Sequence, residues 1–141
     1  MSVERAINNM NAADHTFRAA LRQHRLAPPD DGFSRRLKDF ADACESQRIA
    51  CDYAAQESLG WEPMPAARRP PPPELRPDSG RRGPTEHWAT FDTAWEDLNK
   101  ALEGISLPAV GRAFGELATI ARQLSAAVAE EDIAILRAQQ G

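Results

Sequence analysis

The sequence is poor in histidine, cysteine and lysine, and this scarcity excludes several kinds of chemical site. It has three histidines, at positions 15, 24 and 87, and the residues three positions before them are Ala12, Leu21 and Pro84. A ferritin-like di-iron site needs Glu-x-x-His on two helices. The sequence therefore excludes that class of helical enzyme.

The two cysteines, Cys44 and Cys51, predict neither a metal site nor a disulfide between them. They lie seven residues apart, which at helical rise separates their Cα atoms by about 10.5 Å, too far for a disulfide. No Cys-x-x-Cys, glycine-rich phosphate loop, Gly-x-Ser-x-Gly or His-Glu-x-x-His motif is present. We therefore expect no enzyme, no catalytic residue, no cofactor and no metal. The cysteines are interpreted as small core residues, with pairing between subunits as the alternative.

Long apolar runs are also missing. No window approaches the roughly 18 apolar residues of a membrane span, and the first ten residues include Glu4 and Arg5, unlike a signal peptide. We expect a cytoplasmic protein with no membrane partner. Fifteen arginines against two lysines favour a GC-rich genome, such as that of an actinobacterium.

The net charge of −4 argues against a nucleic-acid partner. The charge is unevenly spread, because residues 60–84 carry five basic and three acidic groups, whereas residues 85–141 carry four and nine. We expect the cationic segment to lie against the protein's own acidic face. The alternative is that it binds an external acidic partner.

Proline is abundant, and it is concentrated in one place. Residues 60–84 hold eight of the eleven prolines, with the run Pro70 to Pro73 at the centre. Proline lacks the N–H that helices and strands need, and a proline run favours polyproline II. The chain is therefore predicted to contain an N-terminal helical hairpin (1–59), a Pro/Arg-rich linker (60–84) and a C-terminal helical hairpin (85–141) that share one core.

Four helices are predicted from apolar periodicity and from caps. They span about residues 2–25, about 31–59 (ending at Leu59-Gly60), 85–103 and about 106 onward. We expect an all-α four-helix bundle of two antiparallel hairpins, with the unmatched ends of the long helices covered by the linker, the first helix or a second protomer. The apolar stripes are Val3, Ile7, Met10, Ala13, Phe17, Leu21; Phe33, Leu37, Phe40, Cys44, Gln47, Cys51, Ala54; Trp88, Phe91, Trp95, Leu98, Leu102; and Leu107, Val110, Phe114, Leu117, Ala121, Leu124, Val128, Ile135.

Two features of the C-terminal half predict close packing. Gly111 and Gly115 lie one turn apart, and small residues let helix backbones approach each other, so this face is predicted to take the nearest neighbouring helix. Trp88 and Trp95 are interpreted as core residues. The alternative is that they line a pocket for a small ligand.

The preferred function is that of a non-catalytic interaction or regulatory adaptor that acts through helix faces and its Pro-rich segment, and that forms a homo-oligomer. A Pro-x-x-Pro strip docks into aromatic grooves, and an exposed tryptophan beside a flexible segment, as we expect of Trp61, is a typical anchor. The predicted partner-binding residues are Trp61, Arg68, Arg69, Pro70, Pro71, Pro72 and Pro73.

Two other functions are carried as alternatives. The predicted first hairpin and the residues Tyr53-Ala54-Ala55-Gln56-Glu57 resemble the small helical-hairpin substrates of type VII secretion, which have Trp-x-Gly in the turn and Tyr-x-x-x-Asp/Glu near the end of the second helix. The chain departs from that pattern because its first turn lacks tryptophan and Trp61-Glu62-Pro63 follows the second helix. The resemblance implies an exported protein. The other alternative is a regulator that responds to a small ligand.

Overall fold

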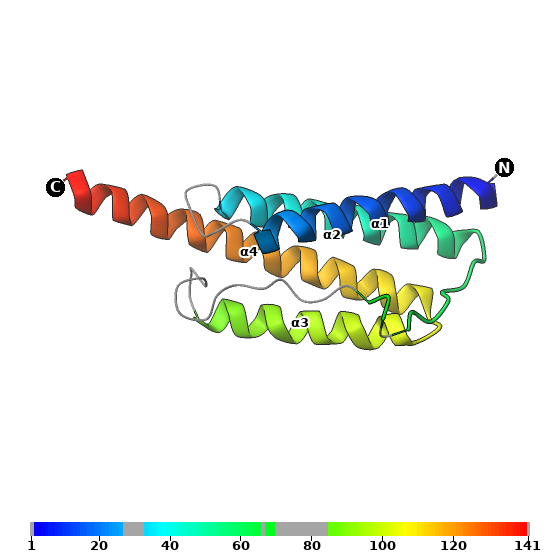
Figure 1. The fold of residues 1–141 in the computed structure, drawn as a ribbon. Helices are drawn as coiled ribbons and strands as arrows, with labels where there is room; N and C mark the ends of the chain where they lie inside the picture. The colour runs from blue at the N-terminus through cyan, green and yellow to red at the C-terminus, as the bar shows by residue number, and fades with distance from the viewer. Residues whose placement is uncertain (1, 27–32, 66, 70–84, 141) are drawn as a thin grey trace.

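The computed structural model describes residues 2–26, 33–65, 67–69 and 85–140. It contains α1 (Ser2–Leu26), α2 (Phe33–Gln56), α3 (Thr85–Glu103) and α4 (Leu107–Gln140), and no strand occurs within the described residues. The four helices lie side by side and pack against each other (Figure 1). The prediction of an all-α bundle is confirmed.

The helix backbones approach each other most closely in three pairs. The most extensive contact joins α2 to α4, while α1 packs on α2 and α3 packs on α4. The elongated arrangement leaves the end of α4 projecting beyond the other helices (Figure 1). The α2–α4 pair is therefore the centre of the fold.

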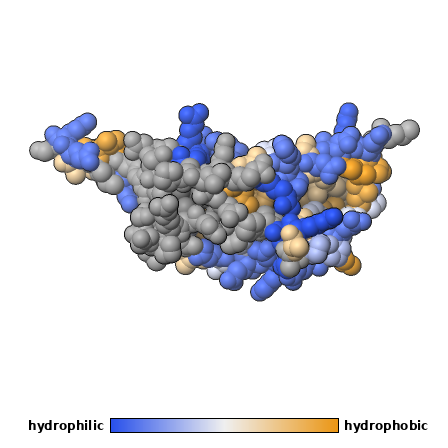
Figure 2. Space-filling view, in the orientation of Figure 1, coloured by the Kyte–Doolittle hydropathy of each residue, from blue (hydrophilic) through white to orange (hydrophobic). Residues whose placement is uncertain are grey.

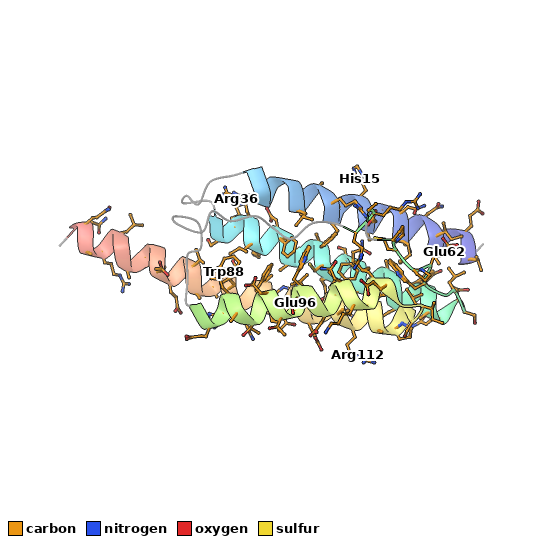
Figure 3. All side chains as sticks on the ribbon, turned by 60° about the horizontal axis from the view of Figure 1, so that its bottom comes forward. His15, Arg36, Glu62, Trp88, Glu96 and Arg112 are labelled. Carbon is orange, nitrogen blue, oxygen red and sulfur yellow. The ribbon has the colours of Figure 1, made fainter. Side chains whose placement is uncertain are left out.

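The core is formed by the stripes that the sequence predicts for α2, α3 and α4, except that the side chains of Phe33 and Ile135 lie outside those that the structure describes. Phe17 of α1 joins them, because its ring lies 5.7 Å from Phe40 and 5.2 Å from Phe114 between centroids. Trp88 and Trp95 are only 3% and 5% exposed, and Trp88 lies among the inner side chains in Figure 3. Their prediction as core residues agrees with this burial, and aromatic pairs at such distances add stabilisation beyond their buried area.

The stripe predicted for α1 is wrong at its N-terminal end. Val3 and Ile7 are 46% and 48% exposed, whereas Ala6 is fully buried. Alanines recur every seven residues on this helix, and Ala50 of α2 lines a groove together with Ala13 of α1. Small side chains permit a short distance between helix axes. The heptad alanines are Ala6, Ala13 and Ala20 on α1 and Ala43 and Ala50 on α2.

The contact between α2 and α4 is close at the two glycines, as predicted. A Cβ atom at Gly111 would lie 3.1 Å from the Cβ of Cys51, and one at Gly115 would lie 2.8 Å from Cδ of Arg48. Near the other end of the contact, the hydroxyl of Ser125 donates a 2.6 Å hydrogen bond to the carbonyl of Ser34. Glycine therefore sets the spacing of the central helix pair.

The end of α2 differs from the predicted boundary at Leu59-Gly60. The helix ends at Gln56, and Ser58 takes the left-handed conformation with φ 61°. The N–H of Ser58 donates to the carbonyl of Ala55 at 3.0 Å, and that of Leu59 donates to Ala54 at 3.1 Å. This is the hydrogen-bond pattern of a Schellman motif, with serine where glycine is usual.

The last turns of α4 remain uncovered within the described chain. Among the side chains that the structure describes, Val128 is the last that is fully buried, whereas Ile133 and Leu136 are 49% and 56% exposed. Figure 2 shows apolar surface at this projecting end of the molecule. The linker or α1 was expected to cover the long helix ends, and no described residue of either buries these two side chains.

Candidate functional site

The described part of the Pro/Arg-rich segment is fixed to the end of α3. The indole Nε1 of Trp61 donates to the carbonyl of Leu102 at 3.2 Å, and the backbone N–H of Met64 donates to the same carbonyl at 2.8 Å. The N–H of Trp61 also donates to Ile105 at 3.4 Å. Leu102 belongs to the last turn of α3, where a helix leaves its carbonyls without intrahelical partners, and Ile105 lies in the connection between α3 and α4.

Trp61 is therefore half-buried, and its ring packs against the core rather than standing free. The sequence interpretation of Trp61 as an exposed anchor needs correction on this point. Glu62 beside it is exposed and lies near one end of the bundle (Figure 3). A role for Trp61 in binding a partner stays a prediction.

The two predicted arginines lie in different environments. The guanidinium of Arg69 forms an ion pair with Glu103 on α3, which is one contact of the kind expected if the cationic segment lies against the protein's own acidic face. Arg68 is exposed, and its carbonyl accepts a 3.0 Å hydrogen bond from Nη2 of Arg18 on α1. Pro70 to Pro73 lie outside the described residues, so only Trp61, Arg68 and Arg69 of the predicted set are placed.

A groove of about 500 Å³ lies between α2 and α4. Arg48 lies beside it and forms ion pairs with Glu45 and Asp52 of its own helix, while Arg122 reaches Asp42 at 3.4 Å. The hydrogen bond from Arg48 lowers the pKa of Glu45, so this carboxylate stays ionised at neutral pH and is unsuited to general-acid catalysis. The groove is lined by Glu45, Arg48, Arg112, Gly115, Glu116, Thr119 and Ile120.

A second groove, of about 370 Å³, lies between α1 and α2. Its floor contains Ala13 and Ala50 of the close alanine contact, and Ile49 on its edge is 55% exposed. Tyr53, the first residue of the Tyr-x-x-x-Glu pattern, lines the same groove, while Glu57 follows the end of α2. The groove is shallow and mixed in polarity, as expected where small residues bring two helices together.

The described side chains form no arrangement typical of a metal centre or an activated nucleophile. No group of three or more His, Cys, Asp or Glu residues that could hold a metal occurs in the described part of the chain. Burial raises the pKa of Cys51 to about 12 and raises that of Cys44 well above its ordinary value. Both thiols are therefore protonated at neutral pH, whereas the thiolate is the nucleophile and metal ligand.

The alternative interpretation of Trp88 and Trp95 was that they line a pocket for a small ligand. In the structure other aromatic rings pack against both indoles. Trp95 stacks 6.3 Å from Phe17 and 6.4 Å from Phe40, and Trp88 lies 5.4 Å from Phe91 in an edge contact. The Nε1 atom of Trp95 is buried and has no acceptor among the described residues. The packing favours a structural role for these rings.

The sequence interpretation expected unmatched ends of the long helices, but it did not identify which side chains the end of α4 exposes. It treated the helix as one apolar seam that continues to Ile135, and it did not separate a second stripe. The signal for a second stripe was present in the sequence, because five residues follow one another at alternating intervals of three and four. They are Ala126, Ala129, Ile133, Leu136 and Gln140. Such spacing is typical of a helix face that contacts another helix.

Comparison with known proteins supplies no function by similarity. No protein-family model, no curated protein and no solved structure matches the chain. None of the described helices is long and apolar enough to cross a membrane. The surfaces described above are thus the basis for a functional proposal.

Proposed function

We propose that this protein is a non-catalytic interaction module, an adaptor or regulator that binds another protein through helix faces. The observation that carries the proposal is the projecting end of α4, which exposes Ile133 and Leu136 beyond the buried residue Val128. An apolar helix face is a common protein-binding element, because a partner that covers it removes apolar area from water.

The architecture that we propose for the module is two antiparallel helical hairpins, residues 1–59 and 85–141, joined by the linker 60–84 around one shared core. The contacts of α1 with α2 and of α3 with α4 support this organisation. The α2–α4 contact would then hold the two hairpins together. In this architecture the core is structural, and binding is left to the exposed ends and edges of the helices.

The linker has a secondary role in the proposal. Trp61 and Arg69 are held on α3, and the further partner-binding residues that we propose are Arg68 and the run Pro70 to Pro73. A cationic Pro-x-x-Pro strip suits an aromatic groove or an acidic surface. We place the protein in the cytoplasm and expect it to self-associate.

The proposal is tested by affinity capture from the native cell. The bait proteins are the wild type, an Ile133→Ser/Leu136→Ser variant, a variant that lacks residues 63–78, and an Ala134→Ser/Ala138→Ser control that alters other exposed positions of the same turns. We expect the specifically captured protein to be lost with the Ile133/Leu136 variant, reduced by the deletion and retained by the control.

A captured set that is unchanged by substitution of Ile133 and Leu136 would refute binding through this helix face. Circular dichroism of each bait checks that the bundle is still folded. Light scattering during size exclusion measures self-association of the same four proteins separately from capture.

A further inference from the structure

The end of α4 carries a second apolar stripe that is distinct from the core seam. At about 100° per residue, Ile133 lies roughly 140° around the helix from Val128, the last fully buried seam residue. Ile133 and Leu136 are 49% and 56% exposed, and the stripe continues to Ala129 on one side and Gln140 on the other. By the same rule Leu136 lies about 80° from Val128, so the stripe lies on the flank of the helix, beside the core seam, and its two large side chains are about half exposed.

We propose that this stripe binds the same stripe of a second copy in the antiparallel direction, so that two α4 helices form a short coiled coil. The inference rests on the proposed function, since it names one partner of the exposed helix face. A three–four stripe is the pattern of the contact positions in a two-stranded coiled coil. Antiparallel pairing sets Ile133 against Leu136 of the second copy and Ala129 against Gln140 of the second copy.

Charge complementarity supports the second copy as the occupant. Glu130 and Arg137 each follow directly after a stripe residue, Ala129 and Leu136 respectively, and both are exposed. In the proposed register Glu130 lies beside Arg137 of the second copy, and the two-fold axis creates this pair twice. Charges that flank the stripe set partner choice and orientation in coiled coils.

The shape of the molecule favours the antiparallel direction. The end of α4 projects past the other three helices (Figure 1), so an antiparallel contact keeps the two bundles at opposite ends of the paired helices. Parallel pairing would bring both bundles to the same end, side by side. The stripe is short and buries less than the roughly 1,200 Å² of a standard interface, so we expect a weak dimer with a Kd of about 10–500 µM.

Disulfide trapping tests the register and direction. In the antiparallel pair, an Ala129→Cys/Gln140→Cys variant brings each new thiol opposite its counterpart in the second copy, so mild oxidation should convert most of the protein at about 0.5 mM to a covalent dimer. Within one helix the two positions are eleven residues apart, about 16 Å, so they cannot pair internally. The single variants Ala129→Cys and Gln140→Cys should remain mostly monomeric, as should the wild type, whose Cys44 and Cys51 are buried.

Covalent dimers from the single variants, with no gain in the double variant, would indicate parallel pairing and overturn the inference. Sedimentation gives an independent readout without new thiols. Glu130→Arg should weaken the dimer at least threefold, and adding Arg137→Glu to it should restore the wild-type Kd, whereas Ile133→Ser/Leu136→Ser should abolish dimerisation.

A wild-type chain that stays monomeric at about 0.5 mM also overturns the inference. In that case, capture of a different protein by the wild type that is lost with Ile133→Ser/Leu136→Ser leaves the proposed function standing. A dimer that is unaffected by the Glu130, Arg137, Ile133 and Leu136 variants counts against the α4 register.

Discussion

Alanine substitution at the two glycines of α4 gives opposite expected changes in stability. In a helix interior, replacing glycine by alanine raises the free energy of unfolding by about 1 kcal/mol. At Gly111 a new Cβ would lie 3.1 Å from the Cβ of Cys51 and 3.4 Å from Oδ1 of Asp52. The Cβ of Cys51 belongs to a packed helix and cannot move alone, and overpacking of this kind costs about 1–3 kcal/mol. Gly111→Ala should therefore lower the free energy of unfolding by about 0–2 kcal/mol.

At Gly115 the nearest atom would lie closer to the new Cβ, but it belongs to a side chain that can move. The new Cβ would lie 2.8 Å from Cδ of Arg48, which belongs to a flexible and partly exposed side chain that can rotate away. The helix-propensity gain should then remain, and Gly115→Ala should leave the protein unchanged or stabilise it by up to about 1 kcal/mol.

Urea unfolding followed by circular dichroism measures both variants, and a difference of 1 kcal/mol corresponds to about 3 °C in Tm for a chain of this size. Equal slopes of free energy against urea concentration are required for the comparison. If Gly111→Ala stabilises the protein as much as Gly115→Ala, the close approach of α2 and α4 at Cys51 is refuted.

Three further predictions address the end of α2, the thiols and the docked segment. Ser58→Gly should raise the free energy of unfolding by about 0.5–1 kcal/mol, because glycine removes the cost of the left-handed conformation. The control is Gly60→Ala, where a Cβ meets no atom within 4 Å, and it should not destabilise the protein. Burial raises the pKa of Cys51 to about 12 and also raises that of Cys44, so above about pH 8.5 only the unfolded thiols lose their protons. The free energy of unfolding should fall between pH 8 and 10, and less steeply when both cysteines are replaced by alanine; equal slopes would contradict the assignment. Acrylamide should quench mainly Trp61, which is half-buried, and Trp61→Phe should remove most of the quenchable emission; strong residual quenching would show that the core tryptophans are accessible.

The core of α3 could be predicted because its apolar period is regular. Its five large apolar residues are spaced at alternating intervals of three and four, and all of them are buried. They are Trp88, Phe91, Trp95, Leu98 and Leu102. One helix face therefore contains nearly all the large apolar side chains, and no competing stripe exists. The close approach at Gly111 and Gly115 was predictable for a related reason, since a side chain that is absent leaves room for a neighbouring helix.

The buried face of α1 depended on its neighbour rather than on its own hydropathy. Val3 and Ile7 are more apolar than Ala6, yet Ala6 is buried and the two larger side chains are about half exposed, because a small side chain suits a close contact between helices. The position of Trp61 is a similar case. Its indole binds the carbonyl of Leu102, 41 residues along the chain, and no local pattern around Trp61 indicates that acceptor.

The end of α4 connects the architecture to the proposed function. Twelve residues of helix follow Val128, and an isolated helix of that length is marginal in water. As the continuation of a packed helix it needs no nucleation, but its Ile133 and Leu136 gain little from folding while they remain exposed. A second apolar stripe that begins at Ala126 overlaps the core seam by one turn, so α4 can serve an internal contact and an external one on different faces. A partner that covers the outer stripe would therefore stabilise this end of the helix and bury its apolar side chains in the same step.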